Sequence, residues 1–78
     1  MNGVPFFAVA GTILKHVDLG RLRYVEHLGD WVLHIVLEAD HGAGPIRVQL
    51  PGSDERIMPT VPWVLEEFAA GRLTDVGN

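Results

Sequence analysis

Histidine is the residue type in this chain best suited to binding a metal ion, because neutral imidazole is a common zinc ligand. The chain has four histidines, His16, His27, His34 and His41. If the chain reverses direction at Gly29-Asp30, His27 and His34 become diagonal neighbours on one face of a hairpin, with Cβ atoms roughly 7 to 8 Å apart. The spacing matches no known zinc pattern, and no third ligand is evident. We therefore expect surface or partner-contacting imidazoles, with no metal site and no cofactor.

Nucleophilic and acid–base chemistry lacks the residues that it needs. The chain has no cysteine, which excludes thiolate zinc sites and cysteine nucleophiles and fits a reducing compartment. Ser53 is the only serine, and it lies in the turn sequence PGSDE rather than in a Gly-x-Ser-x-Gly elbow. Asp54 and Glu55 are adjacent in the same predicted loop, where their side chains diverge and stay solvated. The glycine-rich GAGP at 42–45 lacks the lysine and the following helix of a phosphate-binding loop. We predict that the chain is not an enzyme.

Two apolar runs around Gly29-Asp30, in the stretch RLRYVEHLGDWVLHIVLEAD at 21–40, predict a β-hairpin. With a two-residue loop, Leu28 faces Trp31 and Arg21 faces Glu38 as a cross-strand ion pair. Alternation then sorts the side chains onto two faces. Glu26 conflicts with this register, because it falls on the core side unless it lies at the sheet margin or a β-bulge intervenes. The predicted core side carries Leu22, Tyr24, Leu28, Trp31, Leu33, Ile35 and Leu37.

The rest of the chain predicts a single α+β domain over residues 1–78. We expect a small antiparallel meander of three or four strands at about 7–17, 21–28, 31–39 and 45–50, followed by a helix at about 61–70. The segment 7–17 is ambiguous between strand and helix, and we choose strand because of its β-branched residues and internal glycine. Thr60 is the expected N-cap and Gly71 the residue that ends the helix. The apolar stripe expected to pack on one face of the sheet is Val61, Val64, Leu65 and Phe68.

Charge and hydropathy set the expected compartment and partners. The net charge is −4, and the six basic residues are scattered, which argues against direct nucleic-acid binding. The N-terminus lacks the basic segment of a secretory signal and no run is long enough for a membrane helix, so we expect a cytoplasmic protein that does not contact a membrane. Carboxylates gather in the last third of the chain and could mimic a phosphate backbone toward a basic channel on a partner. These acidic residues are Asp54, Glu55, Glu66, Glu67 and Asp75.

A second candidate contact surface is the hairpin face turned away from the helix. It combines apolar and polar side chains, as an interface with an apolar centre and a polar rim does. A homodimer could bury this face, and the N-terminal VPFFAV could equally fold over it. The monomer and the homodimer both stay open. The residues proposed for contact on this open sheet face are Arg23, Val25, His27, Val32, His34 and Val36.

The overall profile resembles that of the phage-encoded anti-CRISPR inhibitors, which are tiny, acidic, cysteine-free α/β domains without catalytic residues. The resemblance covers size, charge and residue inventory, and no motif carries it. It implies a stoichiometric inhibitor that binds a Cascade-type CRISPR surveillance complex and blocks target DNA through the acidic residues or the open sheet face. The alternative is a small β-rich ligand-binding or adaptor domain, possessing a pocket lined by Tyr24, Trp31 and Trp63.

Overall fold

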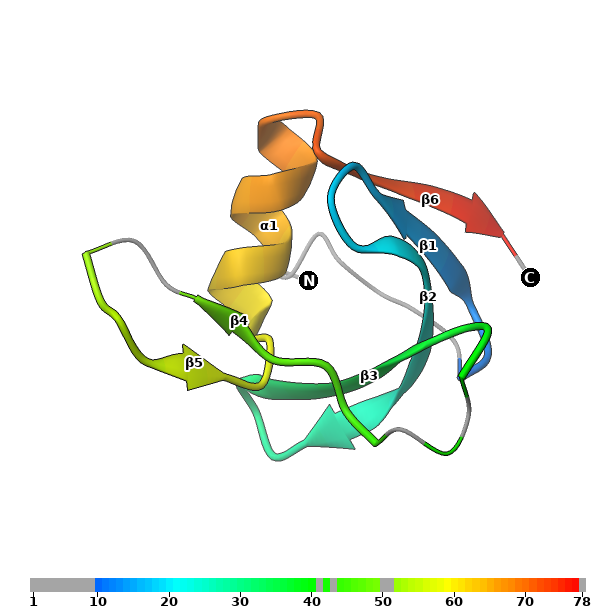
Figure 1. The fold of residues 1–78 in the computed structure, drawn as a ribbon, viewed down its shortest axis with the longest axis horizontal. Helices are drawn as coiled ribbons and strands as arrows, with labels where there is room; N and C mark the ends of the chain where they lie inside the picture. The colour runs from blue at the N-terminus through cyan, green and yellow to red at the C-terminus, as the bar shows by residue number, and fades with distance from the viewer. Residues whose placement is uncertain (1–9, 41, 43, 50–51, 78) are drawn as a thin grey trace.

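The computed structural model describes residues 10–40, 42, 44–49 and 52–77 (Figure 1). It has an antiparallel sheet with one helix packed against it, so the predicted α+β class is confirmed. Among the described residues, no helix combines the length and the apolar character needed to cross a membrane. The elements are β1 (Ile13–His16), β2 (Gly20–Leu28), β3 (Val32–Leu37), β4 (Val48–Gln49), β5 (Arg56–Ile57), α1 (Val61–Ala69) and β6 (Leu73–Gly77).

The main sheet has four strands in the order β3-β2-β1-β6, and every neighbouring pair is antiparallel. The choice of strand for the ambiguous first segment is confirmed over Ile13–His16, while 7–9 lie outside the described residues. The fourth strand is β6, which follows the helix and was not predicted. It pairs with β1 across a sequence separation of 57 positions at His16–Leu73 and 64 at Ile13–Gly77, and no local pattern in the sequence indicates such a contact.

The strand expected at 45–50 does not join the main sheet. Within this segment, the strand is Val48–Gln49, and it pairs with β5 to form a separate two-stranded sheet. Instead, isolated β-bridges from Pro45 and Thr60 cover the outer edge of β3. The N–H of Ile46 donates to the carbonyl of Ile35 at 2.8 Å, and the N–H of Leu33 donates to the carbonyl of Pro59 at 2.8 Å. The edge is therefore covered by short segments, and β4 and β5 form an arm beside the sheet (Figure 1).

Helix α1 begins and ends where the sequence predicts. The Thr60 hydroxyl accepts a hydrogen bond from the Trp63 N–H at 3.3 Å, as an N-cap does. After the last turn, Gly71 adopts a φ of 79°. Its N–H donates to the Phe68 carbonyl at 3.0 Å, and the Arg72 N–H donates to the Glu67 carbonyl at 2.9 Å, which together form a Schellman motif. The predicted N-cap at Thr60 and the predicted helix end at Gly71 are confirmed.

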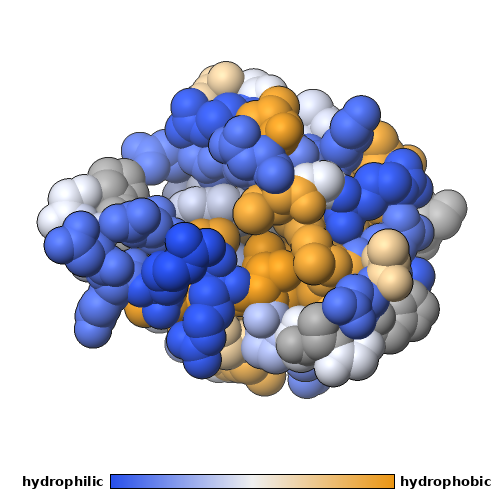
Figure 2. Space-filling view, in the orientation of Figure 1, coloured by the Kyte–Doolittle hydropathy of each residue, from blue (hydrophilic) through white to orange (hydrophobic). Residues whose placement is uncertain are grey.

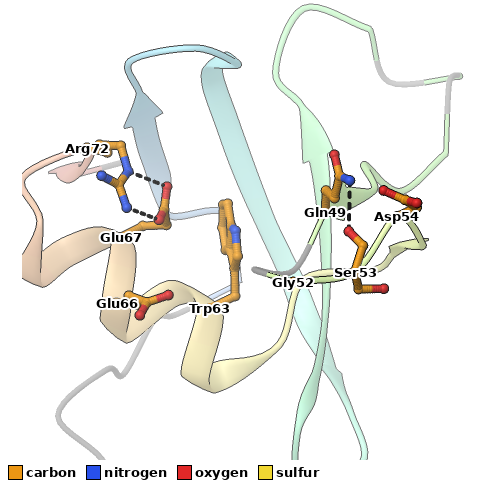
Figure 3. A pocket seen from close by; sticks show the side chains of 8 residues that line it. All are labelled: Gln49, Gly52, Ser53, Asp54, Trp63, Glu66, Glu67 and Arg72. Atoms are coloured by element: carbon orange, nitrogen blue, oxygen red, sulfur yellow. Dashed lines mark hydrogen bonds and ion pairs between the residues drawn. The ribbon is translucent and has the colours of Figure 1, made fainter.

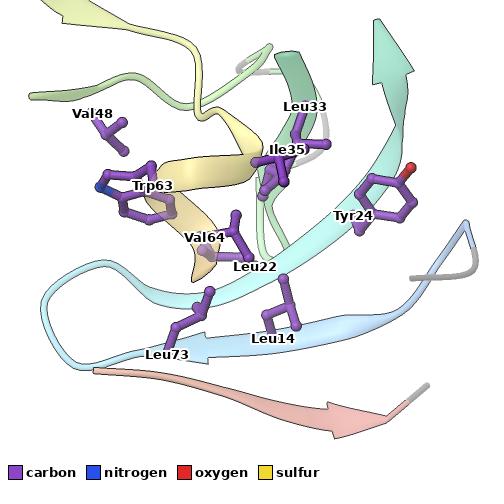
Figure 4. Packing of buried hydrophobic residues seen from close by; sticks show 10 residues of the cluster. Leu14, Leu22, Tyr24, Leu33, Ile35, Val48, Trp63, Val64 and Leu73 are labelled. Atoms are coloured by element: carbon purple, nitrogen blue, oxygen red, sulfur yellow. The ribbon is translucent and has the colours of Figure 1, made fainter. Parts of the chain in front are cut away.

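The helix packs on one face of the sheet, but with a different stripe from the one predicted. Val61 and Val64 are buried as expected, whereas Leu65 and Phe68 are only partly buried. Trp63 and Glu67 take their places, because this side of the helix faces the β4–β5 arm as well as the sheet. Figure 4 shows helix side chains meeting those of the strands. The buried apolar cluster comprises Leu14, Leu22, Tyr24, Leu33, Ile35, Val48, Val61, Trp63, Val64 and Leu73.

The β2–β3 hairpin has a β-bulge that changes half of the predicted register. Leu22, Arg23 and Tyr24 pair with Leu37, Val36 and Ile35 as predicted. The register then shifts between Tyr24 and Glu26, so Val25 is the extra residue, and Leu28 pairs with Val32 instead of Trp31. The loop is therefore Gly29-Asp30-Trp31 rather than Gly29-Asp30, with Gly29 at a φ of 88°.

The bulge moves the residues next to the loop to the opposite faces. Directly paired residues in an antiparallel sheet point to the same side. Glu26 now faces His34 on the outer side, which removes the buried carboxylate that the two-residue loop implied. The predicted core positions of Leu28 and Trp31 are wrong, because these side chains are 43% and 62% exposed. His27 is opposite the buried Leu33 and so leaves the open sheet face.

Candidate binding site

A cleft of about 510 Å³ lies between helix α1 and the β4–β5 arm, which consists of these two strands and residues 52–55 between them. Figure 3 shows the two walls, with arm residues on one side and helix residues on the other. A volume of a few hundred Å³ suits a small ligand or a few side chains of a partner. The lining includes Gln49, Ser53, Asp54, Trp63, Glu66, Glu67 and Arg72.

A second, smaller pocket of about 180 Å³ continues this cleft toward β1. The two share three lining residues, Gln49, Trp63 and Glu67. We call the pair of pockets the α1 groove. In Figure 2 the arm is hydrophilic and borders an area of apolar side chains in the middle of the face. The smaller pocket is lined by His16, Asp18, Leu19, Arg47, Val48 and Arg56 in addition to the shared residues.

Beneath the groove, a network centred on the buried Glu67 joins β1, α1 and Arg72, the residue before β6. The Glu67 side chain, which is 9% exposed, accepts hydrogen bonds from three N–H groups. Oε1 is 2.8 Å from His16 Nε2 and 3.0 Å from Arg72 Nε, and Oε2 is 2.7 Å from Arg72 Nη2. Figure 3 shows the bidentate contact between Arg72 and Glu67. The network ties the helix to the sheet across the edge of the core.

The hydrogen bonds of His16 fix its tautomer. Its Nδ1 accepts hydrogen bonds from the backbone N–H groups of Asp18 at 3.0 Å and Leu19 at 3.3 Å. Nδ1 therefore carries a lone pair, and the proton is on Nε2, which donates a hydrogen bond to Glu67. The ring also stacks on Trp63, with centroids 5.6 Å apart and planes at 18°. Both ring nitrogens are engaged inside the fold. His16 therefore has a positioning role in the structure and no lone pair directed at the groove.

The environment of Glu67 strongly favours its charged form. The hydrogen bonds from Arg72 are the largest cause, followed by the opposing effect of burial and the hydrogen bond from His16, and together they lower the pKa of Glu67 from 4.5 to about 2. The Arg72 guanidinium, whose side chain is 47% exposed, has its pKa raised by the same contact. The charge of Glu67 is thus neutralised locally by Arg72.

The structure brings together three of the five acidic residues predicted for partner contact. Asp54, Glu66 and Glu67 line the larger pocket, although Glu67 is buried and paired rather than exposed. Glu55 is exposed on the arm, and Asp75 is exposed on β6. Neither of these two lines the groove. The predicted acidic face is therefore divided, and its concave part is the end of the groove that contains Asp54 and Glu66.

The residues considered for chemistry have structural partners. Ser53 Oγ accepts from the Glu55 N–H at 3.1 Å, which is the turn role predicted for this serine. The proposed diagonal placement of His27 and His34 is wrong, because the bulge puts them on opposite faces; His27 Nδ1 contacts the Tyr24 hydroxyl and His34 lies 3.9 Å from Glu26. Within the described part of the chain, no three His, Asp or Glu side chains form a group able to hold a metal ion. His41 lies outside that part.

The open sheet face is retained in part. Arg23 pairs with Val36 on this face, and Val32 and His34 belong to it by alternation along β3. Val36 is only 8% exposed, and Val25 is the bulged residue. The alternative that VPFFAV covers this face concerns residues 4–9, which lie outside the described residues. The predicted ion pair between Arg21 and Glu38 is confirmed, with Nε 2.7 Å from Oε1.

The most exposed aromatic side chain of the described residues lies at the end of the β2–β3 hairpin. Leu28, Gly29, Asp30 and Trp31 are all exposed, and we call this segment the hairpin tip. The pocket expected from Tyr24, Trp31 and Trp63 does not form. Tyr24 is buried in the sheet and Trp31 is in the loop, while Trp63 lies at the far end of the core from Tyr24 (Figure 4). No sequence pattern indicated the exposed tip, because its exposure depends on the bulge.

Comparison of the chain with protein-family models, with curated proteins and with solved structures found no match.

Proposed function

We propose that this chain is a protein-binding module without enzymatic activity and that the hairpin tip is its main contact. The observation that carries the proposal is the 62% exposure of Trp31 beside Leu28, which is 43% exposed. Tryptophan is enriched among the residues that dominate protein–protein binding energies, because a rigid indole buries a large area at a small entropic cost. A partner pocket that accepts Trp31 would remove this apolar surface from water.

Acidic groups around the tip indicate the charge of the partner. Glu26 has a side chain that is 61% exposed, and Asp30 is exposed next to Trp31. Together with the net charge of −4, they favour a partner whose pocket has a basic rim. Rim charges of this kind mainly raise the association rate, and salt weakens this effect by screening the charges.

The more specific proposal is an anti-CRISPR type of inhibitor that binds a Cascade-type surveillance complex and blocks target DNA. It is supported by the sequence profile and by the acidic residues, since a surveillance complex must present a basic channel to nucleic acid. The proposal that the chain has no enzymatic activity is supported by His16 and Ser53, whose side chains form hydrogen bonds within the fold.

The experiment is a competition between the chain and labelled target DNA for a purified Cascade-type complex. We expect DNA binding to fall in proportion to added chain and to reach its minimum near a fixed stoichiometric ratio. Raising the salt concentration should weaken the competition, because the rim contacts are electrostatic. Full DNA binding in the presence of excess chain at low salt would refute the inhibitor proposal.

A further inference from the structure

The backbone of the hairpin tip is hydrogen-bonded to the start of helix α1. The Val61 N–H donates to the Trp31 carbonyl at 2.8 Å, and the Leu33 N–H donates to the Pro59 carbonyl at 2.8 Å. These two bonds flank an isolated β-bridge between the two segments. In Figure 1 the chain leading into α1 lies beside the start of β3. The tip is therefore attached to the helix as well as to its own hairpin.

The Trp31 carbonyl completes the hydrogen bonding of the helix N-terminus. The first N–H groups of a helix have no acceptor within that helix. In α1 the Trp63 N–H donates to the Thr60 hydroxyl, and Pro62 has no N–H. Val61 is the first helical residue, and its N–H needs an acceptor from elsewhere, which Trp31 supplies. The loop conformation and the start of the helix therefore stabilise each other.

This attachment fixes the backbone of Trp31 while its indole stays in solvent. The helix side of the attachment belongs to the packed interior, because Val61 and Pro59 are both buried. Leu33, on the strand side, is also fully buried. The Trp31 side chain, by contrast, is 62% exposed. A tryptophan whose backbone is already fixed has only its two side-chain torsions to order when it binds a partner.

We propose that the first turn of α1 presents Trp31 to the partner. The Val61 N–H holds the Trp31 carbonyl, so the hairpin tip has its binding conformation before the partner arrives, and the partner does not have to order the loop. Val61 is itself buried and is a positioning residue that acts through Trp31. This inference rests on the proposed function of the hairpin tip and adds the element that controls its affinity.

Val61→Pro removes the N–H and changes little else at this position. Proline has no N–H and is well accommodated as the first residue of a helix. The preceding residue, Thr60, has a φ of −120° and a ψ of 163°, an extended conformation that a residue before proline favours. The matched control is Val61→Ala, which keeps the N–H and removes more of the buried side chain. A loss caused only by core packing would therefore be at least as large in Val61→Ala.

The first measurement is the order of the tip in the free chain, from nitrogen relaxation of the Asp30 and Trp31 amides. We expect order parameters of about 0.85 in the wild type and in Val61→Ala, and below about 0.6 in Val61→Pro. In the wild type, hydrogen exchange at the Val61 N–H should be as slow as at the Leu33 N–H, which is bonded across the same bridge. This exchange rate decides the question if Val61→Pro does not fold. A rapidly exchanging Val61 N–H, or a tip equally ordered in the two variants, would overturn the proposal.

The second measurement is the affinity for a purified Cascade-type complex. We expect Val61→Pro to bind at least about fivefold more weakly than Val61→Ala, because the partner must then order the tip. In a Trp31→Ala background the two Val61 variants should bind alike, since the hydrogen bond acts through Trp31. Equal affinities of the two variants, or a difference that persists without the indole, would contradict the proposal. Failure of the wild type to bind refutes the proposed function instead, and the order parameters still decide whether Val61 holds the tip.

Discussion

Replacing Glu67 by glutamine should destabilise the fold although the two side chains have the same shape. Glu67 accepts hydrogen bonds from His16 and from two nitrogens of Arg72. A glutamine amide has one acceptor oxygen and one donor nitrogen. One of its two ends would therefore place a donor against a donor inside a site that is 9% exposed, and Arg72 would lose its counter-ion.

The size of the effect follows from the pKa of Glu67. Lowering this pKa from 4.5 to about 2 corresponds to about 3 kcal/mol, because one pKa unit is about 1.4 kcal/mol. Water screens part of the attraction at Arg72, whose side chain is 47% exposed. We therefore expect Glu67→Gln to lower the free energy of unfolding by about 2 kcal/mol at pH 7.

The same pKa gives the effect a pH dependence with a defined sign. Because the pKa of Glu67 is lower in the folded chain than in the unfolded chain, its contribution is complete above about pH 5 and is lost as the pH falls toward 2. The difference between wild type and Glu67→Gln should thus shrink by most of its value between pH 7 and pH 3.

Urea unfolding followed by circular dichroism at pH 7 and pH 3 measures both quantities. Glu66→Gln is the matched control, since Glu66 is the exposed neighbour on the same helix and should change stability by less than about 0.5 kcal/mol. If Glu67→Gln unfolds like wild type at pH 7, or if its deficit is as large at pH 3, the network does not stabilise the fold as argued.

Three further predictions test the fold. Leu33→Ala should lower the free energy of unfolding by about 2 to 5 kcal/mol and Leu28→Ala by less than about 0.5 kcal/mol, because Leu33 is fully buried and Leu28 is exposed. Equal losses would favour the two-residue loop expected from the sequence, in which both side chains face the core. Thr60→Ala should cost about 1 kcal/mol in urea unfolding through loss of the N-cap, with Thr60→Ser largely retaining stability. Gly29→Ala should cost about 1 kcal/mol because φ is 88° while no atom lies within 4 Å of the added Cβ; a neutral result would argue against this loop conformation.

Local signals in the sequence predicted the elements that depend on neighbouring residues. Thr60 and Gly71 mark the helix because capping is decided within one turn of its ends. The hairpin was predicted for the same reason. The length of its loop was not predicted, because a bulge forms where the shifted register buries fewer charges. In the sequence, only the predicted burial of Glu26 indicated that the register shifts.

The candidate site depends on contacts between distant segments. His16 and Glu67 are 51 positions apart, and β6 meets β1 from the other end of the chain. Glu67 was predicted as an exposed acidic residue, since no local pattern shows that a histidine and an arginine enclose it. The groove likewise requires the β4–β5 arm to leave the main sheet, and this follows from how the edge of β3 is covered.

The most direct test of the proposed function is the affinity of a purified Cascade-type complex for wild type, Trp31→Ala and Val17→Ala, measured by titration calorimetry. Val17 is the matched control because it is 65% exposed, compared with 62% for Trp31, and lies outside the hairpin tip. We predict that wild type and Val17→Ala bind alike and that Trp31→Ala binds at least about 30-fold more weakly, which corresponds to a loss of about 2 kcal/mol. Equal affinities of Trp31→Ala and wild type would contradict the role of the hairpin tip.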